Sequence, residues 1–350
     1  MKLGGSTYTL PVKIQQVPRG EIIRGRPEDE TEINVADALI TSGSLIFGCA
    51  DLYTGLLQAY RTKVGFGQEV TFMRIEELEH AAISGLYIAY EVHEELGSRG
   101  EERAQKNQFG ETALLVDIKT EEAVINVLRT AHVPIELISE EHGIVEIGEA
   151  PRFLGVLDGL DGSSVYSLQR GKARYGTMLS IFSSLAPNYG DYLLCGVMIH
   201  SPKPELFFAR KGGGSFVVMD GEWRAISCSG VMKLQETTKI YIDDYFEVNR
   251  ELFAKRLAGF NIQSAHSSAV HYTDVARGAA DAALECTRKR NLEIAVAYGL
   301  VTEAGGVMLT LDKTSLEHRH YRTFSQDKHT PIVTASTLEL ADDIIRYIAS

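Results

Sequence analysis

The sequence predicts a layered domain that combines helices and strands, of the α/β or α+β class. Two observations predict it. Short apolar runs separated by turn residues fill the middle of the chain, and helical patterns alternate with strand patterns towards its end. With 350 residues, 44% of them hydrophobic and 23% charged, the chain has the composition of a globular protein and enough length for a large core.

The first regular element expected is a helix that starts at Ile75. Apolar residues recur there at spacings of three and four as far as Leu96, and Gly97 follows as a stop. A short apolar run at 113–116 then leads to Asp117 and a second helix. The further elements expected are strands at 135–138, 179–182, 193–200, 205–209, 215–219, 282–285 and 332–335, and helices at 270–280 and 292–304.

Residues 1–72 are expected to form an N-terminal extension ahead of a main domain at 73–350. The extension holds three prolines, an acidic stretch at 28–32 and glycines at 65 and 67. No residue pattern in it indicates a chemistry. A contact between subunits and a packed accessory segment both fit this composition, so the role of the extension stays open.

Composition and charge exclude several classes of partner. The net charge of −12 argues against binding of a nucleic acid polymer, although bound cations can reverse the sign of a small site. No apolar run approaches the ~18 residues of a membrane span, and the start of the chain lacks the layout of a secretory signal, so we expect a cytoplasmic protein. The four cysteines are far apart, which favours buried free thiols.

The most informative stretch is Val156–Ser164, where an apolar strand runs into Asp158, Asp161, Gly162 and two serines. A tight turn can direct both carboxylates and the Leu160 carbonyl at one point, and Mg²⁺ prefers such oxygen ligands. A helix starting at Ser163 would place free N–H groups and a hydroxyl where a phosphate can bind. The alternative is a solvated Asp-Gly turn that caps a helix.

Other acids stand in similar places. Glu140 and its neighbour 141 follow a short strand, Asn291 is placed to cap a helix with Glu293 in its first turn, and Asp117 precedes the second helix. Each has an ordinary explanation in helix capping or in the helix dipole. Their joint occurrence in one domain instead indicates a shared acidic site.

The string at 158–163 resembles the DPxDGT/S signature of the superfamily that contains inositol monophosphatase, fructose-1,6-bisphosphatase and bisphosphate nucleotidase. The likeness extends from about Ile75 to the C-terminus in the family's order. It implies the αβαβα layered sandwich of the sugar phosphatases, with a metal-binding half at 73–190 and a second α/β half at 191–350. It also implies a homodimer or a higher homo-oligomer.

The resemblance assigns roles by position. Two or three Mg²⁺ ions would be held by Glu140, Asp158, the Leu160 carbonyl, Asp161 and Glu293. A water would be oriented and deprotonated by Glu140, Ser163 and Asp117. The phosphate and the rest of the substrate would contact Leu160, Asp161, Gly162, Ser163, Ser267, Ser268, Ala269, Glu285 and Glu293.

The implied function is a Mg²⁺-dependent phosphomonoesterase acting on a small sugar or polyol phosphate, with inositol monophosphate preferred. Fructose 1,6-bisphosphate and a 3′(2′),5′-bisphosphate nucleotide are alternatives, and a relative that binds metal or sugar phosphate without turnover is a third. Three departures from the family pattern bear on substrate and rate. Gly159 replaces the usual Pro of the signature, Val165 stands where an Asn is common, and Leu292-Glu293 replaces Trp-Asp.

Overall fold

The computed structural model describes residues 73–326 and 328–350. The expected N-terminal extension at 1–72 therefore lies outside the described residues. The described residues at 73–218 and from Arg224 onwards belong to one compact unit. In its described part, no helix has the length and apolar character that crossing a bilayer requires.

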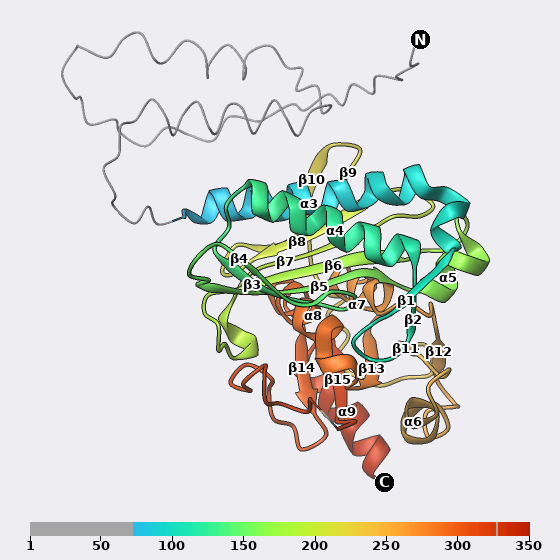
Figure 1. Cartoon of the computed structure of the whole chain (residues 1–350). Helices are drawn as coiled ribbons and strands as arrows, with labels where there is room; N and C mark the ends of the chain where they lie inside the picture. The colour runs from blue at the N-terminus through green and yellow to red at the C-terminus, as the bar shows by residue number, and fades with distance from the viewer. Residues whose placement is uncertain (1–72, 327) are drawn as a thin grey trace, which may run out of the picture. The chain divides into compact units, whose positions relative to one another are not determined.

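An eight-stranded sheet forms the first half of this unit (Figure 1). Its strand order is β10-β9-β8-β7-β6-β5-β3-β4. β3 and β5 run parallel, whereas β5, β6, β7, β8 and β9 pair antiparallel in succession. The strands are β3 (Ile135–Ser139), β4 (Gly143–Ile147), β5 (Phe153–Asp161), β6 (Gly176–Phe182), β7 (Tyr192–Ile199), β8 (Glu205–Arg210), β9 (Gly214–Met219) and β10 (Glu222–Ile226).

Two long helices, α3 (Ile75–Leu96) and α4 (Leu115–Thr130), cover one face of this sheet (Figure 1). α3 packs on β6 and β7, and α4 packs on β5. The short hairpin β1 (Arg103–Lys106) and β2 (Thr112–Leu114) precedes α4. Buried side chains of both helices and of the sheet form one apolar core, so the helical periodicity of α3 is the pattern of its buried face.

The other face of the sheet carries α7 (Ser268–Ala276) and α8 (Leu292–Glu303), which also contact a second sheet. That five-stranded sheet has the order β12-β11-β13-β15-β14. Its strands are β11 (Lys239–Ile242), β12 (Asn261–Gln263), β13 (Ala282–Cys286), β14 (Val307–Thr310) and β15 (Pro331–Ala335). α9 (Leu338–Ala349) packs on its outer face, which completes an α-β-α-β-α succession of layers.

The layered mixture of helices and sheets confirms the expected fold class, and most expected elements are present with small shifts at their ends. The expected helix at 270–280 ends at Ala276, because Gly278 reverses the chain with φ of +73°. The apolar run at 113–116 is divided between β2 and α4: α4 begins at Leu115, which places Asp117 inside its first turn. The expected turn at 158–161 is wrong, because β5 continues to Asp161.

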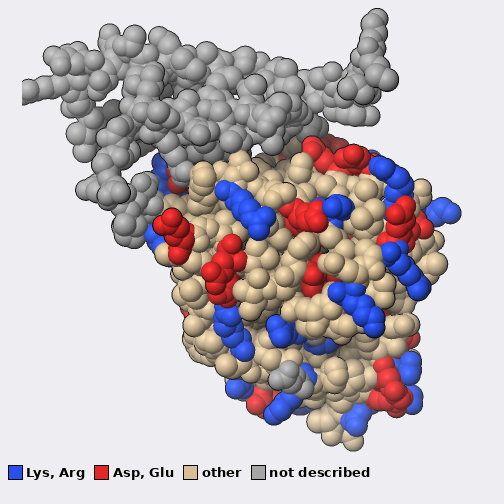
Figure 2. All heavy atoms as spheres, in the orientation of Figure 1, with Lys and Arg blue, Asp and Glu red and all other residues tan. Residues whose placement is uncertain are grey.

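Charged side chains are mixed by sign over the face shown in Figure 2, with no large area of one sign. The three described cysteines, Cys195, Cys228 and Cys286, are free thiols, as their spacing predicts.

Candidate active site

Asp158 and Asp161 end the fully buried strand β5. Side chains three residues apart in a regular strand point to opposite faces. Here Asp158 pairs with Met178 and Asp161 with Gly176, so β5 holds one more residue than β6 over this span. This bulge brings both carboxylates to the same side of the sheet.

Glu293 joins them from the first turn of α8. One oxygen from each of Asp158, Asp161 and Glu293 lies within 4.8 Å of the others, and all three residues are buried. Asn291 precedes α8 as expected, but it has φ of +60° and its Nδ2 donates to the Phe324 carbonyl at 2.8 Å rather than capping the helix. Three buried carboxylates at this separation form a donor set suited to a hard divalent cation.

The N-terminal end of α7 holds the carboxylate of Asp161. The Ser267 hydroxyl and the Ala269 N–H both donate to its Oδ2, the latter at 2.7 Å. Burial raises the pKa of Asp161 to about 6, and the charge of Glu293 adds to this effect. Ser267 and Ala269, expected to contact substrate, thus contact a neighbouring acid of the site.

Glu285 lies in β13 and faces the same acids. The hydroxyl of Tyr272 donates to its Oε1, and the Ser268 hydroxyl lies 3.5 Å from its Oε2. Burial raises the pKa of Glu285 to about 7, opposed by the charge of Arg288. We call Asp158, Asp161, Glu285 and Glu293 the β5 acid group.

Arg288 is a member of this site that the sequence reasoning missed. Its Nη2 lies 3.7 Å from Glu293 Oε1 and 3.5 Å from the Ser268 hydroxyl, and its guanidinium lies 3.9 Å from the centre of the Phe246 ring. The available signal was the run of three basic residues at 288–290, between two expected site acids.

A second set of acids, which we call the α4 acid group, consists of Asp117, Glu121, Glu140 and Glu141. The parallel pairing of β3 with β5 sets Ser139 opposite Leu157, which brings Glu140 close to the end of β5. Glu121 is fully buried, and four donors reach its carboxylate: the N–H groups of residues 140 and 141 at 3.0 Å, the Ser139 hydroxyl and His142 Nδ1. Glu121 therefore fixes the turn after β3.

Asp117 caps α4 with one carboxylate oxygen and lies near Ser163 with the other. Its Oδ2 accepts the Leu114 N–H at 2.7 Å, which caps α4, and its Oδ1 lies 3.5 Å from the Ser163 hydroxyl. That hydroxyl also donates to the Leu160 carbonyl at 3.2 Å. Burial raises the pKa of Asp117 well above its usual range, and the charges of Glu140, Glu141 and Glu121 raise it further.

Gly162 precedes the short helix α5 (Ser163–Gln169) with φ of +93°. An open cavity of about 300 Å³ lies beside Ser163 and is lined by Arg103, Thr112, Leu114, Ser163, Ser164 and Ser167. The backbone turn at Gly162 thus sets Ser163 at the border between the acids and an accessible surface.

Close packing explains why a glycine occupies position 159. A Cβ atom there would lie 2.7 Å from Glu121 Cγ and 2.8 Å from the Asp117 carbonyl oxygen. Its own carbonyl accepts the Thr177 hydroxyl at 2.7 Å. The close approach of α4 to β5 therefore excludes any side chain at this position, including the Pro of the family signature.

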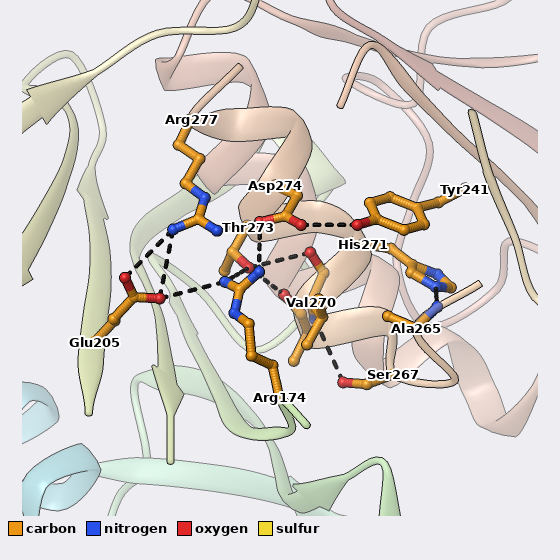
Figure 3. Close-up of polar contacts among 11 residues, drawn as sticks. Arg174, Glu205, Tyr241, Ala265, Ser267, Val270, His271, Thr273, Asp274 and Arg277 are labelled. Atoms are coloured by element: carbon orange, nitrogen blue, oxygen red, sulfur yellow. Dashed lines mark hydrogen bonds and ion pairs between the residues drawn. The ribbon is translucent and has the colours of Figure 1, made fainter. Parts of the chain in front are cut away.

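A ring of ion pairs holds α7 against the first sheet (Figure 3). Arg174 and Arg277 both pair with Asp274 Oδ1, at 2.6 and 2.7 Å, and both lie within 3.4 Å of Glu205. Tyr241 donates to Asp274 Oδ2 at 2.8 Å, which adds β11 to the network. Because Ser267 begins α7, this ring also helps to fix the donors that reach Asp161.

The five-layer fold and the buried acids at the end of β5 are the features that the resemblance to a phosphatase family implies. The model of the inositol monophosphatase family matches residues 70–348, so the chain belongs to that family. The expected fold class and the expected likeness to the inositol monophosphatase superfamily are both confirmed.

Two curated relatives are similar in sequence. The fructose-1,6-bisphosphatase/inositol-1-monophosphatase of Methanothermobacter thermautotrophicus is 28% identical over 253 residues, which cover 68% of this chain and 84% of that protein. The bifunctional NADP phosphatase/NAD kinase of Methanococcus maripaludis is 27% identical over 205 residues, 55% of this chain and 36% of that protein. The match therefore spans about a third of the bifunctional protein.

Solved structures share the fold at low sequence identity. An inositol monophosphatase from Anabaena has a TM-score of 0.59 at 18% identity, covering 77% of this chain and 94% of that one. The fructose-1,6-bisphosphatase of Leishmania major has a TM-score of 0.62 at 14% identity, covering 78% and 94%.

Proposed function

We propose that this member of the phosphatase family is a Mg²⁺-dependent phosphomonoesterase that hydrolyses a small sugar or polyol phosphate, with inositol monophosphate as the first substrate to test. The observation that carries the proposal is the β5 acid group, in which three buried carboxylates converge within 4.8 Å. Fructose 1,6-bisphosphate and a 3′(2′),5′-bisphosphate nucleotide are the alternative substrates, and the NADP phosphatase relatives add NADP to the panel.

The residues present fit a divalent metal. Asp158, Asp161 and Glu293 supply hard oxygen donors, and the Leu160 carbonyl and Glu140 are the further proposed ligands. Bound Mg²⁺ would supply positive charge to the phosphate oxygens and lower the pKa of water, the role of metal ions in hydrolysis. The family match supports this identity of the ion.

Ser163, Asp117 and Glu140 are the proposed catalytic residues. The Ser163 hydroxyl lies between the Leu160 carbonyl and Asp117 Oδ1, so its lone pairs can accept a hydrogen bond from an attacking water and hold that water in place, while the Asp117 carboxylate would take the proton. Burial raises the pKa of Asp117, which makes this carboxylate a better proton acceptor. Glu140 raises that pKa further by its charge.

The remaining proposed residues hold the substrate. The N–H groups that follow Gly162 and the Ser163 hydroxyl would bind the phosphate, together with the Leu160 and Asp161 backbone. Glu285 in β13 and Ser268 in α7 would face the substrate, and the Glu285 carboxylate can accept hydrogen bonds from substrate hydroxyls. Ser267 and Ala269 support the site through Asp161, and Glu293 borders both metal and substrate.

We further propose that residues 73–350 are the catalytic domain, with the boundary between its halves near 190, and that the protein acts in the cytoplasm as a homodimer or higher homo-oligomer. Its partner would be a small phosphate ester rather than a nucleic acid polymer or a membrane. The second candidate is a non-catalytic protein that binds sugar phosphate. Arg288 favours it, because a guanidinium beside Glu293 already supplies a cation.

The test is inorganic phosphate release from a panel of inositol 1-phosphate, fructose 1,6-bisphosphate, adenosine 3′,5′-bisphosphate and NADP, with Mg²⁺ and with a chelator. We expect release from at least one substrate that requires Mg²⁺. Asp342→Asn, on the outer helix α9, serves as the control acid and should keep the rate. Release that persists in the chelator would contradict the proposal, and bound Mg²⁺ without release would favour the non-catalytic candidate.

A further inference from the structure

Arg288 places a fixed positive charge inside a site built for a metal ion. It lies in the segment between β13 and α8, and its side chain is only 18% exposed. Burial lowers the pKa of Arg288, but the charges of Glu293, Glu285 and Asp161 more than reverse this and raise it. The guanidinium therefore stays charged among the acids of the β5 acid group.

The bonds that Arg288 makes are weak for an arginine in this setting. Charge-assisted N–H···O bonds have ordinary lengths of about 2.7–2.9 Å. Nη2 of Arg288 lies 3.7 Å from Glu293 and 3.5 Å from Ser268, and its Nε has no acceptor in the described part of the chain. Arg174, in contrast, lies 2.6 Å from Asp274. Arg288 is therefore held by the field of the acids and by the Phe246 ring, 3.9 Å away, more than by hydrogen bonds.

The acids need such a charge when no cation is bound. Asp158, Asp161 and Glu293 are buried with one oxygen of each within 4.8 Å of the others, and the repulsion between such carboxylates costs folding free energy. The guanidinium of Arg288, 3.7 Å from Glu293, offsets part of this repulsion. A divalent ion placed between Asp158, Asp161 and Glu293 would neutralise the same carboxylates and would be repelled by the guanidinium.

We propose that Arg288 is a resident counter-ion of the metal site, which balances the negative charge of the β5 acid group without metal and competes with the incoming divalent cation. The inference rests on the proposed function, since it assumes that the group binds metal. It predicts that this chain binds metal more weakly than the same site would without the guanidinium.

The test is titration of the protein with Mn²⁺ in the absence of substrate, with binding measured by calorimetry. Arg288→Met removes the charge and keeps most of the apolar stem over Phe246, and we expect it to bind Mn²⁺ at least about tenfold more tightly than the parent. Arg288→Lys keeps the charge and should stay within about threefold of the parent.

Arg319→Met is the matched control. Its guanidinium also lies over a phenylalanine, 5.6 Å from the Phe324 ring, and pairs loosely with an acid, 3.9 Å from Asp312. It contacts neither acid group, so the affinity for Mn²⁺ should equal that of the parent. A general effect of lost surface charge would change both methionine variants alike.

Thermal unfolding supplies a second readout that does not need turnover. Without metal, Arg288→Met should melt below the parent, and saturating Mn²⁺ should raise its melting temperature by more than it raises that of the parent. If Arg288→Met does not fold, Arg288→Gln, which keeps a donor towards Ser268, carries the same prediction.

Unchanged or weaker Mn²⁺ binding by Arg288→Met and Arg288→Gln would overturn the counter-ion role and leave the metal site in place. Weaker phosphate binding with unchanged Mn²⁺ affinity would instead make Arg288 a substrate ligand, which also overturns the role. Failure of the parent and all variants to bind Mn²⁺ would overturn this inference and the proposed function together.

Discussion

The β5 acid group and the α4 acid group are both buried, but they differ in what faces their oxygens. Glu121 of the α4 group accepts four donors, two of them backbone N–H groups of the turn it holds. In the β5 group, Asp161 and Glu285 have pKa values raised to about 6 and about 7, by burial first and by other acids after it. A carboxylate whose oxygens accept hydrogen bonds from several protein donors stabilises the fold. A buried carboxylate close to other acids is destabilised by their negative charge and is available to bind a cation.

Removing a ligand from the β5 acid group should break function and spare the fold. For Asp158→Asn and Glu293→Gln we expect turnover to fall more than about a thousandfold, equivalent to about 4 kcal/mol. Stability without metal should hold or rise, because each change relieves repulsion among buried acids. Steady-state phosphate release measures the turnover, and urea unfolding of the same preparations measures the stability. Normal turnover in either variant would remove that residue from the metal site.

The opposite result is expected for Glu121, the structural member of the α4 acid group. Glu121→Ala leaves two buried N–H groups and a hydroxyl without their acceptor, which should cost about 3–5 kcal/mol of unfolding free energy. Urea unfolding measures the loss, and Glu122→Ala, one residue along and paired only with exposed Lys119, is the control. A loss near that of the control would show that Glu121 does not hold the turn after β3.

A side chain at position 159 should strain the contact between the two groups. Gly159→Ala places a Cβ atom 2.7 Å from Glu121 Cγ and 2.8 Å from the Asp117 carbonyl, so α4 or β5 must shift at a cost of up to about 3 kcal/mol. Gly259→Ala meets no atom within 4 Å and serves as the control. Thermal unfolding of the two variants should differ. Equal melting temperatures would contradict the tight packing of α4 on β5.

The smallest effect expected is a pH dependence. The pKa of Glu285 is raised from 4.5 to about 7 in the folded protein, so the folded state holds this proton more tightly than the unfolded state. The stabilisation is fully present below about pH 4.5 and is lost as the pH rises through about 7. Relative to Glu285→Gln, the metal-free parent should therefore lose on the order of 1–2 kcal/mol of stability between pH 5 and pH 8.

Urea unfolding of parent and Glu285→Gln at pH 5, 6, 7 and 8 measures this difference. Subtraction of the two curves cancels contributions shared by both proteins, including those of the buried histidines. A difference that does not change with pH would mean that Glu285 is ionised in the folded protein throughout this range.

The sequence was sufficient to predict most of the regular elements and to single out the three buried acids that converge at the end of β5. The periodicity of α3 and the apolar run of β5 are local patterns, and Asp158, Asp161 and Glu293 stand at element ends where a local pattern locates them. The grouping of Glu293 with the two aspartates rested on their joint occurrence and on the family resemblance, because Glu293 lies more than 130 positions from Asp161.

Contacts between segments that are distant in the sequence could not be predicted from local sequence patterns. The bulge in β5 depends on its register with β6, the role of Glu121 depends on the turn after β3, and Arg288 reaches Glu293 only through the irregular chain between β13 and α8. Gly159 stood out in the sequence only as a departure from the family signature, yet the close approach of α4 requires it. Each of these depends on packing between elements that the sequence does not place side by side.

The measurement that tests the central claim most directly pairs turnover with stability in Asp161→Asn. Phosphate release at saturating Mg²⁺ and urea unfolding in a chelator are recorded for this variant and the parent. The account predicts that Mg²⁺-dependent release disappears while the metal-free protein unfolds at the same or a higher urea concentration. Release that continues at the parent rate would contradict the claim that the β5 acid group performs the chemistry.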